Sequence, residues 1–241
     1  MKSQKIKCFA IDIDGTIADD TGRIDFEAAE SLRILCDLGY KVIFVSGRTG
    51  WEVYVLAAYL GTTRIGVGEN GGVIVKSPID FILLGDNSKA LMAFDLLSKK
   101  ISNVELKPTL PRMTEVVLKR TFDLSLGKGI INESGLPVKL VDSTFAYHIA
   151  NKDVNKSVGL KVALKHMQIN PEDVIAVGDS DTDVSMFEYV GTSISVGNAT
   201  EAAKKSSTYH VKNIVGKGLV EAIHLSFRKV IGSDLEKGYS K

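Results

Sequence analysis

Short apolar runs alternate with amphipathic segments at both ends of the chain. An apolar run from Cys8 ends at Asp14, and alanine and leucine then recur at helical spacing from Asp25 to Leu38. The other expected elements are strands at 42–45, 174–177, 193–196 and 209–211, and helices at 51–60, 156–167, 184–189, from Thr200 and at 219–230. Buried strands that alternate with helices predict an α/β fold with a parallel sheet covered on both faces.

The middle of the chain has a different pattern. Its candidate elements are one helix at 89–101 and short strands at 115–119, 138–141 and 147–150, with Pro108, Pro111 and Pro137 between them. Strands and helices that cluster separately are typical of an α+β unit. We therefore predict a smaller α+β domain at 83–152, inserted into a core formed by 1–82 and 153–241.

Composition narrows the class of protein without identifying it. The 241 residues are 44% hydrophobic and 24% charged, with a net charge of +1, which gives no reason to expect a nucleic-acid or membrane partner. Cys8 and Cys36 lack metal spacing and are expected to be reduced core residues, so we predict a cytoplasmic protein. The polar tail at 234–241 is expected to fray. The oligomeric state stays open, with a homodimer among the options.

Chemistry-bearing side chains follow several of the predicted strands. Asp12 and Asp14 end the first strand, Ser46 follows the second, and Asp179 and Asp183 follow the strand at 174–177. Ligands of open α/β sheets bind beyond the carboxyl ends of the strands, so these side chains should meet at one edge. Lys156 begins the helix that leads into the acidic strand, and could reach the same crevice.

Two carboxylates as close as Asp12 and Asp14 repel each other unless a cation lies between them. Hard divalent ions take oxygen ligands, so the pair favours Mg²⁺. The alternative is an ordinary strand-end turn with solvated aspartates. Four carboxylates, one hydroxyl and one ammonium at one edge are better explained by a site for Mg²⁺ and phosphate.

These residues form four motifs in a familiar order. The motifs are Asp12-Ile13-Asp14-Gly15-Thr16, Ser46-Gly47-Arg48, Lys156, and Gly178-Asp179-Ser180-Asp181-Thr182-Asp183. With them the chain resembles the phosphatases of the haloacid dehalogenase superfamily. The resemblance implies a Rossmann-like core, and the inserted domain is similar to the cap of the Cof-type subgroup. One position departs from that subgroup, because Thr182 stands where asparagine is usual.

The resemblance implies a role for each motif residue. Asp12 would be the nucleophile that forms an aspartyl-phosphate, and Asp14 the general acid and base. Ser46, Gly47 and Lys156 would bind the phosphoryl group. The ligands of Mg²⁺ would be Asp12, the backbone carbonyl of Asp14, Asp179 and, directly or through water, Asp183.

The short cap is most similar to that of archaeal phosphoglycolate phosphatases, which implies 2-phosphoglycolate as the small phosphorylated substrate. A sugar phosphate or a phosphoglycerate derivative is the alternative substrate, and a non-catalytic protein that binds phosphorylated metabolites is a third reading. A carboxylate on the substrate would need a cation from the cap, for which Arg112, Lys119 and Arg120 are candidates. His148 is expected to have a structural role, while Arg48 is open between substrate contact and helix packing.

One further motif is interpreted as a decoy. Residues 66–71 match the dinucleotide-binding pattern of glycines letter for letter. That pattern requires a helix next, whereas the residues at 73–75 have the character of a strand. A tight turn is therefore predicted at this point.

Overall fold

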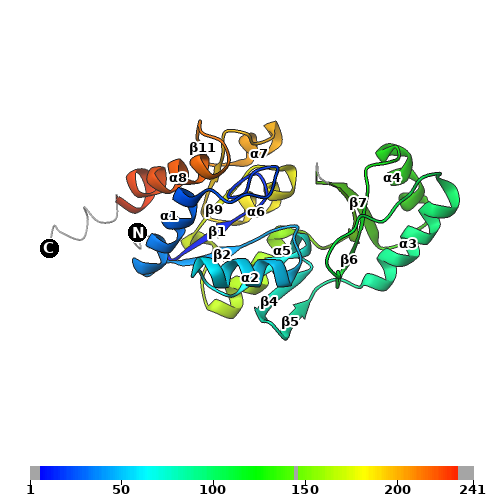
Figure 1. Cartoon of the computed structure of the whole chain (residues 1–241), viewed down its shortest axis with the longest axis horizontal. Coiled ribbons are helices and arrows are strands. Elements are labelled where there is room, and N and C mark those ends of the chain that lie inside the picture. The colour runs from blue at the N-terminus through cyan, green and yellow to red at the C-terminus, as the bar shows by residue number, and fades with distance from the viewer. Residues whose placement is uncertain (1–5, 144–145, 233–241) are drawn as a thin grey trace.

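The computed structural model describes residues 6–143 and 146–232, and these form a larger core and a smaller cap (Figure 1). The core sheet has five parallel strands in the order β11-β10-β9-β1-β2. They are β1 (Cys8–Ile11), β2 (Lys41–Phe44), β9 (Val174–Gly178), β10 (Thr192–Ser195) and β11 (Tyr209–His210). The predicted α/β fold with a parallel sheet is confirmed.

Helices cover both faces of this sheet. They are α1 (Phe26–Asp37), α2 (Gly50–Leu60), α5 (Lys156–Met167), α6 (Val184–Tyr189), α7 (Glu201–Ser206) and α8 (Val215–Ser226). Side chains alternate along a strand, so Phe9 and Ile11 of β1 pack with α1 and α8, whereas Cys8 and Ala10 pack with α5 and α6. Burial also raises the pKa of the Cys8 thiol, as expected of a core residue.

A small antiparallel sheet extends the core next to β2. It consists of β3 (Gly66–Gly68), β4 (Val73–Ser77) and β5 (Asp80–Leu83), and Val45 bridges to Val67. Glu69–Gly71 forms a single 3₁₀ turn (η1) that leads directly into β4. The turn predicted within the decoy motif is therefore confirmed.

The cap is a three-stranded antiparallel sheet with two helices on one face. Its strands are β6 (Glu115–Leu118), β7 (Val138–Asp142) and β8 (Tyr147–Asn151), in the order β6-β8-β7, and its helices are α3 (Asn87–Lys100) and α4 (Leu124–Glu133). Leu118 and Ile149 pack in the apolar cluster of the cap. Val117 and His148, on the opposite face, line a cavity between cap and core. In the sequence, the cap elements come between β5 and α5. The domain boundaries at 82/83 and 152/153 stay a prediction.

Several helical segments differ from the sequence expectations. The helix α4 was not predicted, because Gly127 and Gly129 lower the helix propensity of its sequence. Helix α8 begins at Val215, earlier than the predicted start at 219. The prediction was late because Gly216 and Gly218 lower the helix propensity of the first turn. A single π-helical segment, η4 (Phe227–Ile231), follows it, and short 3₁₀ turns at η2 (Pro171–Asp173) and η3 (Asp181–Asp183) flank β9.

Two further expectations concern the membrane and the C-terminal tail. In the described part of the chain, no helix is both long and apolar enough to cross a membrane. The tail expected to fray at 234–241 lies outside the described residues.

Candidate active site

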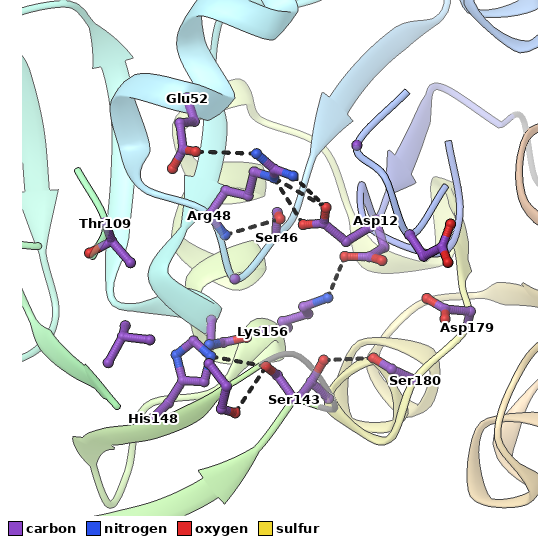
Figure 2. Close-up of a pocket in the computed structure, with 18 of the residues that line it drawn as sticks. Asp12, Ser46, Arg48, Glu52, Thr109, Ser143, His148, Lys156, Asp179 and Ser180 are labelled. Carbon is purple, nitrogen blue, oxygen red and sulfur yellow. Dashed lines mark hydrogen bonds and ion pairs between the residues drawn. The ribbon is translucent and has the colours of Figure 1, made fainter. Parts of the chain in front are cut away.

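A cavity of about 480 Å³ lies between the core and the cap. The predicted residues Asp12, Asp14, Ser46, Gly47, Lys156 and Asp179 all line it from the core, and Val117, Ser143 and His148 line it from the cap. Figure 2 shows Lys156 pointing toward Asp12, with Asp179 nearby. The side chains predicted to meet at the carboxyl ends of the strands therefore line one cavity.

The centre of the site is a buried ammonium between two carboxylates. Lys156 is the first residue of α5 and is 2% exposed. Its Nζ donates to Asp12 Oδ1 and to Asp183 Oδ1, at 2.6 Å each. Burial works to lower the pKa of Lys156, but the two carboxylates outweigh it and raise that pKa. Lys156 therefore stays a cation.

Burial raises the pKa of the Asp12 carboxyl well above its usual range, and the nearby Asp183 adds to this, while Lys156 opposes it. For the same reasons, first burial and then Asp183, the pKa of Asp179 rises to about 7. Thr16 Oγ1 joins the two groups, since it donates to Asp12 Oδ2 at 3.4 Å and to Asp179 Oδ1 at 3.3 Å. The carboxylates of Asp12, Asp179 and Asp183 thus bring together more negative charge than Lys156 alone can balance.

Local backbone structure holds the acidic residues together. Asp183 Oδ2 accepts from the backbone N–H groups of Asp179 and Ser180 at 3.0 and 2.9 Å, so the turn η3 fixes that side chain. Gly15 has φ +85°, and a Cβ there would lie 2.2 Å from Asp179 Oδ2. Only glycine allows both that conformation and that approach, which explains its place after Asp14.

The donor set fits a hard divalent cation. Carboxylate oxygens of Asp12, Asp179 and Asp183 lie within 4.8 Å of one another. Three carboxylates around one ammonium leave two negative charges uncompensated when all are ionised. A divalent ion would neutralise them, and Mg²⁺ binds carboxylate oxygens of this kind. The Asp14 carboxylate lies outside this group, consistent with a role other than metal binding for that side chain.

Asp14 instead forms a close ion pair with Arg48. Arg48 Nε donates to both Asp14 oxygens, at 3.0 and 3.2 Å, and Arg48 Nη2 donates to Asp14 Oδ1 at 2.6 Å. Arg48 Nη1 also reaches Glu52 Oε1 at 3.2 Å, and Glu52 closes a capping box with Thr49 at the start of α2. Arg48, left open by the sequence, therefore orients the second aspartate.

The loop after β2 carries Ser46, the first residue of the second motif. Ser46 is 1% exposed, and its Oγ accepts from the backbone N–H of Arg48 at 3.1 Å. The hydroxyl hydrogen is then available to donate into the crevice. A Cβ on Gly47 would lie 3.1 Å from Asn70 Oδ1, so the loop passes close to the η1 turn.

The cap contributes residues that the sequence interpretation missed or undervalued. Glu115 is buried, and it accepts from Arg112 Nη1 at 2.5 Å and pairs with His148 Nδ1 at 3.1 Å. Lys119 and Arg120 instead pair with Glu105 and Asp142 and do not line the cavity. Of the three cap cations predicted as candidates to meet a substrate carboxylate, Arg112 is therefore the one that lines the cavity. The signal for Glu115 was present in the sequence, as a lone charged residue at the start of an apolar strand.

The profile of the haloacid dehalogenase-like hydrolases matches residues 9–100 and 136–223. A phosphoglycolate phosphatase of Nitrosopumilus maritimus is 44% identical over 220 residues, which are 91% of this chain and 95% of that protein. One from Archaeoglobus fulgidus is 35% identical over 91% of this chain and 96% of that protein.

This chain belongs to the haloacid dehalogenase-like hydrolases. The resemblance predicted from its four motifs is confirmed. A crystal structure of a Thermoplasma acidophilum protein has the same fold, with a TM-score of 0.83 at 22% identity, over 92% of this chain and 98% of that one.

Thr182, which stands where asparagine is usual, lies in the acidic turn η3 of the hydrolase site. Thr182 Oγ1 is 2.8 Å from Ser180 Oγ, and Ser180 Oγ donates to Asp183 Oδ2 at 3.0 Å. The threonine therefore supports the acidic turn through one hydroxyl contact. It also lines both the main cavity and a neighbouring cavity of about 200 Å³.

Proposed function

We propose that the protein is a Mg²⁺-dependent phosphatase that hydrolyses 2-phosphoglycolate to glycolate and phosphate. The observation that carries the proposal is the separation of the two neighbouring aspartates. Asp12 lies against Lys156 and the acidic cluster, whereas Asp14 is held by Arg48. This separation supports Asp12 as the acceptor of the phosphoryl group and Asp14 as the residue that carries the proton.

The first step is the transfer of the phosphoryl group to Asp12. A carboxylate oxygen of Asp12 forms a bond to phosphorus, and the bond from phosphorus to the glycolate oxygen breaks. In this step Asp14 leaves its ion pair with Arg48 and acts in its protonated form, so that its proton passes to the leaving oxygen. Ser46 donates to a phosphoryl oxygen, and Lys156 offsets the negative charge beside Asp12.

The second step regenerates the enzyme. Asp14 takes a proton from water, the water oxygen bonds to phosphorus, and the bond between Asp12 and phosphorus breaks. Asp12, Asp179, Asp183 and the carbonyl of Asp14 would hold Mg²⁺. When bound, the ion would neutralise charge that otherwise repels the phosphate dianion from the carboxylates.

The choice of substrate is supported by the relatives and by the size of the site. Both relatives named above bear the name phosphoglycolate phosphatase, and each aligns over nearly its whole length. The cavity of about 480 Å³ is shared by the catalytic residues and the cap face, which suits a small phosphorylated acid better than a large one.

A phosphate-release assay with a panel of metabolites tests the proposal. The panel contains 2-phosphoglycolate, 3-phosphoglycerate, hexose phosphates and p-nitrophenyl phosphate, each with Mg²⁺ and with excess EDTA. We expect the highest kcat/KM for 2-phosphoglycolate, and loss of activity with EDTA that added Mg²⁺ restores. A higher kcat/KM for hexose phosphates would favour the sugar-phosphate alternative, and no release from any ester would favour a binding protein.

A further inference from the structure

A buried carboxylate in the cap organises a group of side chains that the proposed reaction does not use. Glu115 is the first residue of β6, and its side chain has no exposed surface. Its Oε1 contacts both Arg112 Nη1, at 2.5 Å, and His148 Nδ1, at 3.1 Å, while its Oε2 accepts from Asn70 Nδ2 at 3.3 Å. One carboxylate thus fixes two basic side chains.

The two basic side chains of this group share one ionised carboxylate. Burial works to raise the pKa of Glu115, but His148 and then Arg112 outweigh it and lower that pKa, so Glu115 is ionised. His148 Nε2 lies 3.0 Å from Ser143 Oγ, whose hydroxyl donates to the carbonyl of Ala146 at 3.2 Å. Both ring nitrogens of His148 are therefore engaged, one with Glu115 and the other with Ser143, so the ring is held in one orientation.

The group faces the site of phosphoryl transfer. Arg112, Ser143 and His148 line the same cavity as Asp12 and Lys156. In Figure 2, His148 and Ser143 lie together, apart from the Asp12 and Asp179 carboxylates. Basic side chains of the cap therefore lie across the crevice from the predicted phosphoryl acceptor.

Arg112 also connects this group to the loop that follows Ser46. Its Nη1 donates to the carbonyl of Gly47 at 2.5 Å. Its Nε is buried and has no hydrogen-bond partner within residues 6–143 and 146–232. A buried guanidinium nitrogen without a partner carries a desolvation cost that an added anionic acceptor would relieve.

The position of these residues in the chain suits a role in specificity. The family profile matches 9–100 and 136–223, so Arg112 and Glu115 fall in the stretch that it leaves out. The chemistry common to the family lies in the matched parts of the core. Arg112 and Glu115 therefore lie outside the matched core, where a role in the choice of substrate is expected.

We propose that Arg112 and His148 form the subsite that binds the carboxylate of the phosphorylated acid, and that Glu115 is the positioning residue that holds both. The inference rests on the proposed function, because it takes a substrate with a phosphate at one end and a carboxylate at the other. The Arg112 guanidinium, whose Nε has no partner in the described residues, donates to the carboxylate, and the His148 ring lines the subsite beside it, while the phosphate lies toward Asp12 and Ser46.

The test compares two substrates that differ only at the carboxylate end. They are 2-phosphoglycolate and 2-hydroxyethyl phosphate, in which a hydroxymethyl group replaces the carboxylate. The selectivity ratio is kcat/KM for the first divided by kcat/KM for the second. Because both substrates share the phosphate, this ratio cancels general damage to the site, including any that follows from loss of the contact with Gly47.

We expect Arg112→Ala to lower the selectivity ratio roughly 10- to 150-fold, the size of a lost charge-assisted hydrogen bond. His148→Gln should lower it by about 10-fold or more, since an amide side chain cannot contact Glu115 and Ser143 as the ring does and so cannot keep the shape of the subsite. Glu115→Gln should raise KM for 2-phosphoglycolate far more than for 2-hydroxyethyl phosphate, with little change in kcat. The matched control is Arg120→Ala, an arginine of the same cap that pairs with Asp142 outside the cavity, and it should leave the ratio unchanged.

The outcomes separate the two proposals. A wild-type enzyme with no preference for 2-phosphoglycolate over 2-hydroxyethyl phosphate overturns the choice of substrate. A wild-type preference that survives both Arg112→Ala and His148→Gln overturns the carboxylate subsite and leaves the phosphatase proposal standing. Should Arg112→Ala fail to fold, as judged by its thermal melt, His148→Gln decides alone. An equal rise of KM for both substrates in Glu115→Gln would make that residue merely structural.

Discussion

The two walls of the crevice are built in opposite ways. The core wall is lined by Asp12, Asp14, Ser46, Lys156 and Asp179, with Asp183 buried behind Lys156, and the cap wall is lined by Arg112, Ser143 and His148, with Glu115 buried behind them. The core wall has too much negative charge, and the pKa values of Asp12 and Asp179 are raised by burial and by Asp183. The cap wall has two basic groups around one buried carboxylate.

This difference implies a division of labour. In the proposed reaction, the core wall supplies the groups needed for any phosphate monoester, namely a nucleophile, a proton carrier and a cation site. The cap wall gathers donors for a second anionic group, which only some esters have. Changes on the core wall should therefore affect all substrates, and changes on the cap wall should alter the choice among them.

The largest expected effect is that of Asp12→Asn. The amide keeps the shape of the side chain but cannot be phosphorylated, so turnover of 2-phosphoglycolate and p-nitrophenyl phosphate should both fall by about 10³-fold or more. The melting temperature should not fall, since a strained buried charge is removed. Phosphate release and thermal melts measure the two effects. Turnover within tenfold of the wild type would exclude covalent catalysis by Asp12.

The next effect separates the two neighbouring aspartates. Asp14→Asn removes the proton carrier, so 2-phosphoglycolate hydrolysis should fall by about 10²- to 10⁴-fold. With p-nitrophenyl phosphate, whose leaving group needs no proton, we expect a burst of about one nitrophenol per enzyme molecule and then a stall. Stopped-flow absorbance detects that burst. Its absence would mean that Asp14 does not act after Asp12 is phosphorylated.

The core wall was predictable because its chemistry is local in the sequence. Asp12 and Asp14 follow a buried strand directly, and Ser46 and Asp179 follow two others. In a parallel sheet the carboxyl ends of strands meet at one edge, so strand prediction alone brings these residues together. The partner of Asp14 was not predictable, because the reach of Arg48 across 34 positions depends on side-chain conformation.

The cap wall could be predicted only in part. Its strands β6, β7 and β8 were expected, but the sequence does not give their order, and the order is what pairs Val117 with His148 and sets Glu115 beside it. The helix α4 was missed because two glycines lie within it. One of them is required by packing, since a Cβ on Gly127 would lie 2.7 Å from a carbon of Phe122. Tertiary packing overrode helix propensity at that position.

A smaller effect tests the charge imbalance of the core wall. The pKa of Asp179 rises from 3.8 to about 7 in the folded metal-free protein, so that state holds a proton which the unfolded chain releases at lower pH. The stability from this proton is present below about pH 4 and is lost as the pH rises through about 7. In EDTA, Asp179→Asn should therefore melt several degrees above the wild type at pH 8, and the gap should narrow at pH 6.

Mg²⁺ should reverse this order. The wild type gains stability from the bound ion, whereas Asp179→Asn has lost a ligand and should need a much higher Mg²⁺ concentration for half-maximal activity. Melts at both pH values, with and without the ion, measure the effect. A gap in EDTA that is equal at pH 6 and pH 8, or a lower melting temperature for the variant at pH 8, would show that Asp179 is not strained by its surroundings.

The smallest expected effect lies where the two walls meet. Thr182→Asn replaces the hydroxyl that contacts Ser180 at 2.8 Å with an amide that can make a similar hydrogen bond. Because one neutral hydrogen bond contributes about 1 kcal/mol, we expect kcat/KM and the Mg²⁺ requirement to stay within about fivefold of the wild type.

Ser185→Ala is the matched control for Thr182→Asn. Its Oγ is buried without a partner in the described part of the chain and lies beside the smaller cavity alone, so its loss should leave activity unchanged and stability equal or higher. A change of more than tenfold in the Mg²⁺ requirement of Thr182→Asn, with Ser185→Ala unaffected, would mean that Thr182 shapes the metal site itself. A change confined to the selectivity ratio would instead mean that Thr182 acts with the cap wall in the choice of substrate. The boundary between the core wall and the cap wall would then lie closer to Asp183.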